Sequence, residues 1–314
     1  MSPLIEVQSL RKHFGSVVAV DDISFAVDRG EVLGFLGPNG AGKSTTMKII
    51  TGYLPATDGR AAVCGHDIAL QPIEAKRTMG YLPEGAPLYG DMTPTGFLDF
   101  IGRARRMPRA ERKRRIAEVV ERMELGEVLH RRIETLSKGF RRRVGLAQAI
   151  LHDPDVLILD EPTDGLDPNQ KHQVRELIKS MGDRKAIIIS THILEEVDAV
   201  CDRAIIIDHG KVVSDGTPAQ LHARSPEHNA VMMRVPAGDA ARTTQLLMGL
   251  PEVDRVEERA RAQSSVLLMA VPKNGQFIGD LVAFTLRENN IAAADLHAEA
   301  GKLDDVFRKL TTIA

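Results

Sequence analysis

The residues best suited to chemistry lie in one glycine-rich stretch, GPNGAGKST, at 37–45. It consists of Gly37, Pro38, Asn39, Gly40, Ala41, Gly42, Lys43, Ser44 and Thr45. The glycines allow backbone conformations that a Cβ would block, so successive N–H groups can point at one anion. Lys43 offers a positive charge to phosphate groups, and Ser44 offers a hydroxyl to Mg²⁺. The spacing G-x-x-x-x-G-K-[ST] therefore predicts a site for nucleotide phosphates.

The segments beside this stretch indicate how it is held. Residues 32–36 form an apolar run that predicts a buried strand, and residues 46–50 predict the start of a helix. The helix N-terminus then adds its partial positive charge to the anion site. The alternative is a glycine-rich turn that binds nothing, but the order of strand, loop, Lys-Ser and helix favours a phosphate loop.

Two carboxylates close a second apolar run, at residues 155–162. This run predicts a buried parallel strand with Asp160 and Glu161 at its carboxyl end, where open α/β sheets bind ligands. Because alternate strand residues face opposite sides, we expect Asp160 to hold Mg²⁺, partly through water, and Glu161 to act as general base on the attacking water. Taken alone, the run is also compatible with a structural strand that ends in a turn.

Two further side chains are candidates with an open alternative. His192 directly follows an apolar strand predicted at 186–190, so it can contact the γ-phosphate or serve as a structural hydrogen-bond partner. Phe14 lies in a polar link between two short strands predicted at 4–7 and 23–27. Its ring can stack on a purine base or pack on a turn.

The composition is typical of a soluble protein with two domains. The chain has 314 residues, of which 43 % are hydrophobic and 27 % charged, and its formal net charge is −2. Such a charge gives no general attraction to nucleic acid or anionic lipid, so we expect no nucleic-acid partner. Two distant cysteines, Cys64 and Cys201, argue against a disulfide framework or zinc site and fit a reducing compartment. Without a signal-peptide core or a membrane-length apolar run, we expect another chain to supply any membrane spans.

Residues 86–152 predict a helical subdomain. Within it, Ile116, Val119, Val120 and Met123 recur at the spacing of one helix face. The opposite face is strongly basic and predicts either a solvated surface or a contact with acidic partner loops or lipid head groups. Its cations are Arg103, Arg105, Arg106, Arg109, Arg112, Lys113, Arg114 and Arg115.

A change of composition at 223–229 predicts a linker, which divides the chain into domains at 1–224 and 229–314. Between 230 and 297 the elements follow the order β-α-β-β-α-β, which is the ferredoxin-like order. No phosphate, metal or nucleophile motif lies there, so we expect that the chemistry does not need this domain. The final helix, at 302–311, has one apolar face, which can pack on its own small sheet, on the first domain or on a second chain.

The segments GPNGAGKST, LSKGF, VLILDEP, DGLDP and STH follow one another in the order and spacing of ATP-binding-cassette (ABC) ATPases. The resemblance covers residues 1–222 and implies ATP and Mg²⁺ as ligands. LSKGF stands where that family has its signature, and Ser137 is also the expected N-cap of a helix. The resemblance implies that Ser137 and Gly139 contact the γ-phosphate held by a second subunit, with Asp167 at the subunit junction.

Two departures from the family pattern indicate which branch of the family the sequence resembles. The signature is poorer in glycine than usual and does not end in glutamine, reading LSKGFR over 136–141. Glu84 stands where the family usually offers glutamine to Mg²⁺, and it either holds Mg²⁺ itself or faces the membrane partner. Together with GLAQAI at 145–150 and LDDVFRKLT at 303–311, these features are similar to the ABC-2 exporter branch, which includes gliding-motility, copper-processing and multidrug types.

We therefore expect an α/β fold: a P-loop ABC nucleotide-binding domain with a mixed sheet and a helical subdomain, plus the small α+β domain. The resemblance implies base stacking by Phe14, a switch role for His192 and an accessory, regulatory or dimer-supporting role for residues 229–314. It also implies a homodimer or pseudo-dimer closed head to tail on two ATP molecules, and a separate multispan permease that holds the chain at the cytoplasmic face of the inner or plasma membrane. The alternative is a single-cassette ATPase with a non-transport role, either in assembly of a membrane complex or at ribosomes or nucleic acid.

Overall fold

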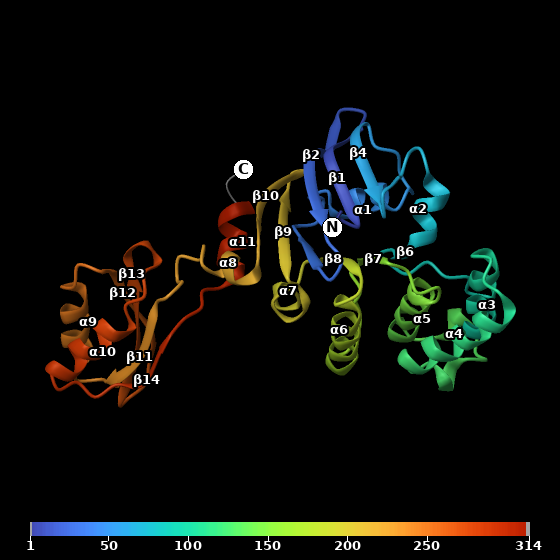
Figure 1. Ribbon diagram of the computed structural model, residues 1–314. Helices are drawn as coiled ribbons and strands as arrows, with labels where there is room; N and C mark the ends of the chain where they lie inside the picture. Colours follow the sequence, from blue (N-terminus) through green and yellow to red (C-terminus); the bar gives the residue numbers. More distant parts are fainter. Residues whose placement is uncertain (1, 312–314) are drawn as a thin grey trace. The chain divides into compact units, whose positions relative to one another are not determined.

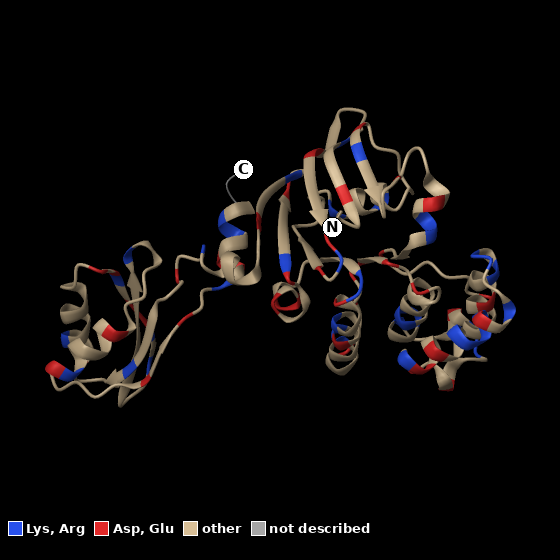
Figure 2. Cartoon of the chain, in the orientation of Figure 1, with Lys and Arg blue, Asp and Glu red and all other residues tan. Residues whose placement is uncertain are grey.

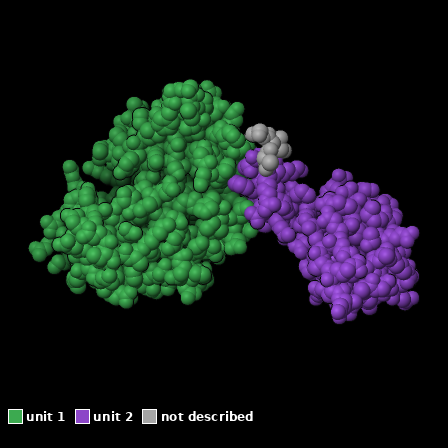
Figure 3. Space-filling view, turned by 180° about the vertical axis from the view of Figure 1, so that it is seen from behind, with its two compact units in different colours: residues 1–217 green, residues 218–314 purple. Residues whose placement is uncertain are grey.

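The computed structural model describes residues 2–311 and divides the chain into two compact units, residues 1–217 and 218–314 (Figure 3). The boundary thus lies before the linker expected at 223–229. The reason is that residues 222–229 form hydrogen bonds with residues 299–301, which belong to the second unit. His222 Nδ1 donates to the Gly301 carbonyl (2.9 Å), and the Asn229 N–H donates to the Glu299 carbonyl (2.9 Å).

A six-stranded sheet forms the centre of the first unit (Figure 1). Its strands are β3 (Val32–Leu36), β6 (Met79–Leu82), β7 (Val156–Asp160), β8 (Ala186–Thr191), β9 (Arg203–Asp208) and β10 (Lys211–Gly216). They lie in the order β10-β9-β3-β8-β7-β6, and every pairing except that of β10 with β9 is parallel. All residues of β3, β7 and β8 are buried, which is why these strands are continuous apolar runs. Their carboxyl ends meet at one edge of the sheet.

A second, antiparallel sheet carries Phe14. Its strands are β1 (Ile5–Phe14), β2 (Val17–Val27), β4 (Asp58–Val63) and β5 (His66–Asp67), in the order β2-β1-β4-β5. The prediction of two short strands joined by a polar link is wrong, because β1 and β2 form a long hairpin in which Phe14 pairs with Val17. Positive φ at Ser9 (45°) and Asp22 (62°) and shifts in register interrupt the alternation of apolar and polar residues, so the full strands are hidden in the sequence.

Helices cover the sheets of the first unit. They are α1 (Lys43–Ile50), α2 (Pro72–Thr78), α3 (Pro94–Ala104), α4 (Arg109–Arg122), α5 (Lys138–Ile150), α6 (Pro168–Gly182) and α7 (Leu194–Val200), with 3₁₀ turns η1 (Gly126–Val128) and η2 (Ile133–Thr135). Helix α1 begins at Lys43, earlier than expected, because Gly42 is its N-cap in a left-handed conformation. Ser137 is the N-cap of α5 as expected, and its side chain accepts from the Phe140 N–H (3.3 Å). Within residues 2–311, no helix is both long and apolar enough to span a bilayer.

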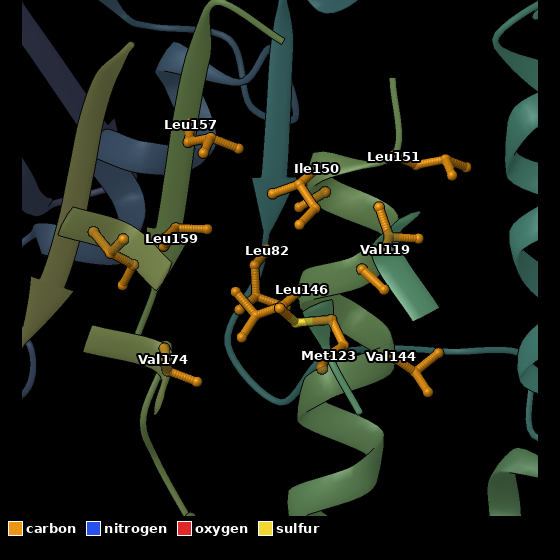
Figure 4. Close-up of a cluster of buried hydrophobic side chains, with 14 of the residues drawn as sticks. Leu82, Val119, Met123, Val144, Leu146, Ile150, Leu151, Leu157, Leu159 and Val174 are labelled. Carbon is orange, nitrogen blue, oxygen red and sulfur yellow. The ribbon is translucent and has the colours of Figure 1, made fainter. Parts of the chain in front are cut away.

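One apolar cluster joins the helical region to the central sheet (Figure 4). It combines side chains of α4 and α5 with others from β6, β7 and α6. Labelled members are Leu82, Val119, Met123, Val144, Leu146, Ile150, Leu151, Leu157, Leu159 and Val174. The predicted apolar face of α4 is therefore confirmed, with Ile116 and Val120 packed against the same cluster. The helices that follow Glu84 are thus anchored on the strands that carry the carboxylates.

Four of the eight cations on the basic face of this region form ion pairs within the chain. Arg103 and Arg112 bond to Asp99, and Arg114 and Arg115 bond to Glu118. Figure 2 shows acidic and basic side chains intermixed over α3 and α4. Acidic side chains of the same helices therefore pair with half of the cations on this face. The pairs made by the exposed Arg103 and Arg114 add little stability each, whereas Arg112 and Arg115 are largely buried.

The second unit contains α8 (Pro218–His222), β11 (Val231–Pro236), α9 (Ala240–Met248), β12 (Val253–Arg261), β13 (Ser265–Pro272), η3 (Lys273–Gly275), α10 (Gly279–Glu288), β14 (Ala294–Ala298) and α11 (Leu303–Thr311). Its antiparallel sheet has the order β12-β13-β11-β14, and the elements follow the expected β-α-β-β-α-β order. Helix α11 packs against α8, which the predicted boundary had placed in the first domain, and Leu303 and Val306 are buried.

Candidate nucleotide site

The phosphate loop connects β3 to α1, and three of its glycines are sterically required. Gly40 and Gly42 have φ of 86° and 105°, which L side chains rarely adopt. A Cβ at Gly37 would lie 2.4 Å from the Ile207 carbonyl oxygen, and one at Gly42 would lie 2.5 Å from that of Ala19. The backbone of neighbouring strands therefore holds the loop in a shape that only glycine permits.

Lys43 is drawn over this loop instead of extending into solvent. Its Nζ donates to the carbonyls of Gly37 (2.6 Å) and Pro38 (3.1 Å), and the residue is only 7 % exposed. Burial lowers the pKa of Lys43, while the carboxylates of Glu161 and Asp160 oppose that shift. The ammonium is thus close to both the loop and the acidic side chains at the end of β7.

A pocket of about 300 Å³ opens above the loop. Its lining residues are Ala19, Asn39, Gly40, Gly42, Lys43, Ser44, Thr45, Glu84 and Glu161. The fold thus brings together three distant parts of the chain: the predicted phosphate loop, Glu84, which was one of the predicted Mg²⁺ ligands, and Glu161, the predicted general base. Such a polar pocket at the carboxyl edge of a parallel sheet suits a phosphorylated ligand.

Asp160 ends β7 and is 1 % exposed. Its Oδ1 accepts from the Ser190 hydroxyl and lies 3.4 Å from Ser44 Oγ. Its Oδ2 is buried and, among the residues that the structure describes, has no hydrogen-bond partner. A buried carboxylate oxygen without a donor beside a serine hydroxyl is an oxygen set that a hard cation prefers, so these residues fit Mg²⁺.

Glu161 lies just past β7, and its backbone is left-handed, with φ of 50°. The argument from alternate strand residues is therefore wrong for Glu161, because the backbone turns at this residue and no longer follows the strand. The Glu161 N–H donates to Ser190 Oγ (3.0 Å). Both side-chain oxygens of Glu161 lie 3.0 Å from His192 Nδ1. The two predicted catalytic side chains are thus in direct contact, with Glu161 facing the pocket.

The environment of Glu161 predicts a pH dependence. Burial raises the pKa of Glu161, while its contact with His192 and the positive charge of Lys43 oppose that shift. A general base works only when ionised, so turnover should fall as the pH drops through this raised pKa, at a higher pH than for an exposed glutamate. His192→Ala removes an influence that lowers the pKa, so the acidic limb of the kcat–pH profile should move to higher pH. A limb that stays in place or moves to lower pH would exclude this pairing from turnover.

Phe14 lies at the end of β1 and is 48 % exposed, with Lys12 Nζ 5.1 Å from its ring centroid. The ring is not packed into a turn, and it does not line the pocket, where the hairpin contributes Ala19. An exposed aromatic face is compatible with base stacking, which remains a prediction.

Ser137, Gly139 and Asp167 do not line this pocket, but the last two are close to each other. A Cβ at Gly139 would lie 2.6 Å from Gln170 Oε1, and Gln170 forms a capping box with Asp167 at the start of α6. Lys138, which departs from the glycine-rich family signature, donates to Asp164 Oδ2 (2.9 Å). The structure therefore joins the signature to the DGLDP segment on one surface, separate from the chain's own phosphate loop.

Arg142 is a functional candidate that the sequence reasoning missed. It lies on α5, is 4 % exposed, and its Nη2 donates to the carbonyls of Asp160 (2.8 Å) and Glu161. Its Nη1 donates to the Pro83 carbonyl (3.3 Å), next to Glu84. A buried guanidinium requires hydrogen-bond acceptors. These carbonyls therefore fix the position of the Arg142 side chain, and Arg142 in turn fixes the backbone that carries the carbonyls. The available signal was a run of three arginines at 141–143 on an otherwise apolar helix.

Comparisons with known proteins agree with this geometry. A family model described as ABC transporter matches residues 20–164. The linearmycin resistance ATP-binding protein LnrL of Bacillus subtilis (strain 168) is 37 % identical over 222 residues, covering 70 % of this chain and 71 % of that protein. The Nod factor export ATP-binding protein I of Ralstonia nicotianae is 32 % identical over 311 residues, covering 99 % of this chain and 94 % of that protein.

A solved structure of an ATP-binding subunit of an ABC transporter has 33 % identity and a TM-score of 0.66, and the match covers 70 % of this chain and 92 % of that one. A cassette described as dimeric, MJ0796, shares the fold at a TM-score of 0.64 and 23 % identity, over 68 % of this chain and 98 % of that one. The phosphate loop, the carboxylates of β7 and these relatives lead to one assignment: the chain belongs to the ATP-binding proteins of ABC transporters.

Proposed function

We propose that this protein binds ATP with Mg²⁺, hydrolyses it, and energises a separate membrane permease of the exporter type. The observation that carries the proposal is the pocket in which Lys43, Ser44 and Glu161 meet. The exporter assignment is supported by relatives named for Nod factor export and linearmycin resistance. It is also supported by the ABC-2 features of the sequence. The permease would hold the chain at the cytoplasmic face of the membrane.

Each residue of the pocket has a defined task in this proposal. The loop N–H groups and Lys43 bind the phosphates, replacing the carbonyls that now accept from Nζ. Ser44 and Asp160 would hold Mg²⁺, which neutralises phosphate charge when bound. Glu161 accepts a proton from the attacking water, and His192 orients Glu161 through the 3.0 Å contacts.

The proposal includes a dimer in which each chain completes the other's site. Ser137, Gly139 and Asp167 lie outside the chain's own pocket, yet the first two offer a hydroxyl and N–H groups at a helix N-terminus. A two-fold, head-to-tail arrangement would apply these groups to the partner's ATP. The second unit would serve as an accessory, regulatory or dimer-supporting domain, since none of its residues that the structure describes lines the pocket.

Glu84 provides a test of the metal site. It lines the pocket, and a carboxylate there binds a hard cation more strongly than an amide does but repels phosphates when the cation is absent. Turnover of the wild type should therefore depend more steeply on Mg²⁺ concentration than turnover of Glu84→Gln. Titration of ATPase activity with Mg²⁺ measures this. Superimposable curves would instead support the alternative that Glu84 faces the membrane partner.

A second cavity, of about 730 Å³, is a candidate docking site for the permease. Its walls combine the cations Lys76, Arg77, Arg105 and Arg106 with apolar side chains of α2 and α3, against a single acidic residue, Glu111. This combination suits an amphipathic permease segment with acidic residues. Two lining residues, Arg105 and His152, contact the Met79 carbonyl at the start of β6, the strand that leads to Glu84.

Co-purification with a multispan membrane protein, together with ATPase assays, tests this function. We expect Arg106→Glu to weaken the complex, whereas Arg109→Glu, a matched charge reversal on the same basic face but outside the cavity, should not. Intact ATPase activity in both variants would show that the nucleotide site is preserved. Recovery of ribosomes, nucleic acid or only an assembly complex, with no permease, would favour the non-transport alternative.

A further inference from the structure

Behind the nucleotide pocket, a buried carboxylate joins the two loops that carry Glu161 and His192. Glu196 lies on α7 and is 4 % exposed. Its Oε1 accepts from the hydroxyl of Thr163, two residues after Glu161, and its Oε2 accepts from the hydroxyl of Thr191 (2.8 Å), just before His192. The two oxygens of one side chain therefore bond to the two loops separately.

Glu161 and His192 need such a link because β7 and β8 no longer pair with each other at this point, although Thr191 still pairs with Leu36 of β3. The parallel pairing of β7 with β8 ends at Asp160 and Ser190. Beyond that pair, Glu161 adopts a left-handed backbone and His192 leaves the strand, yet their side chains remain 3.0 Å apart. A carboxylate bonded to both sides fixes the separation of the loops where the backbone ladder has ended.

A nearby cation compensates the negative charge of Glu196. Arg175 of α6 lies 3.8 Å from Glu196 Oε1, which compensates a carboxylate that is almost fully buried. Thr191 Oγ1 in turn accepts from the Ile193 N–H (3.0 Å), so its hydroxyl is oriented at both ends. None of these residues lines the nucleotide pocket, and Glu196 therefore acts only through its neighbours.

We propose that Glu196 is a positioning residue that maintains the contact between Glu161 and His192 that hydrolysis requires. The inference rests on the proposed ATPase function. Since misplacing a catalytic group by about 1 Å can cost on the order of 100-fold in rate, Glu196→Ala should lower kcat by about 10- to 100-fold. ATP affinity should stay within about twofold, because the phosphate loop is untouched. An ATP-bound dimer should accumulate.

The matched control is Glu195→Ala, which removes an exposed carboxylate from the same first turn of α7. It should leave kcat unchanged. Glu196→Gln should restore most of the activity, because the amide oxygen still accepts from one threonine and its N–H can donate to the other. A merely structural role predicts instead that ATP affinity, thermal stability and kcat of Glu196→Ala fall together.

Thr163→Val and Thr191→Val keep Glu196 in place and decide the matter if Glu196→Ala does not fold. Each should lower kcat, and adding Thr163→Val to Glu196→Ala should cause no further loss. Wild-type kcat in both threonine variants, equal kcat in Glu196→Ala and Glu195→Ala, or full additivity of the double variant would overturn the inference. Absence of wild-type hydrolysis would instead overturn the proposed function, so the two failures are distinguishable.

Discussion

Glu161→Gln should retain ATP binding and lose turnover by about 100-fold or more, because the amide keeps the shape of the side chain but cannot accept the proton of water. The phosphate loop, Lys43 and the Asp160 carboxylate are unchanged by this substitution. ATP should therefore bind, persist, and hold two chains together. Size measurement with and without ATP, beside steady-state hydrolysis, reports both effects.

The control for this prediction is Glu84→Gln, which neutralises another carboxylate of the same pocket and should not trap the dimer. If Glu161→Gln hydrolysed ATP at a rate near that of the wild type, Glu161 would not be the base. The left-handed backbone of Glu161 would then be only a turn beside the pocket.

Mixing two inactive variants should regenerate nucleotide-dependent dimers if the site is shared between chains. Lys43→Ala removes the positive charge that binds the phosphates. Ser137→Arg places a bulky side chain where the signature would contact the partner's ATP. Neither variant alone therefore contains an intact site. A mixed dimer pairs the intact loop of one chain with the intact signature of the other. With equal, random mixing, about one quarter of all composite sites should be intact.

A suitable control mixes Lys43→Ala with the double variant Lys43→Ala/Ser137→Arg, which contains no intact loop. Dimer formation upon ATP addition and recovered hydrolysis in the first mixture, but not in the second, would support action in trans. A first mixture that shows no ATP-dependent dimer would contradict the head-to-tail arrangement. Ser137 and Gly139 would then need another role.

The sequence was most informative where a residue's neighbours along the chain determine its surroundings. The apolar runs of β3, β7 and β8 are buried on both faces, so their composition alone predicts them. The phosphate loop is equally local, because its glycines, Lys43 and Ser44 lie within one turn. The length of β1 was hidden, since register shifts and the positive φ of Ser9 break its alternating pattern.

Features that depend on contacts across the chain could not be predicted. The left-handed turn at Glu161 is held by Ser190 and by the guanidinium of Arg142, which comes from another helix. Glu196 follows a strand and resembles any acidic residue in the first turn of a helix, and only the fold shows the two threonines that it joins. The run of arginines at 141–143 does not show which carbonyls Arg142 contacts, and the link made by Glu196 leaves no trace in spacing or composition.

Arg142 has a consequence for kinetics if the chain dimerises as proposed. Helix α5, which begins at the signature, donates hydrogen bonds through Arg142 to the Asp160 carbonyl at the end of β7 and to the Pro83 carbonyl. A displacement of that helix, caused by ATP in the partner's loop, would therefore move the backbone that bears this chain's own base. The two ATP molecules would then not be consumed independently, and the rate should rise with ATP concentration along a sigmoidal curve instead of a hyperbola.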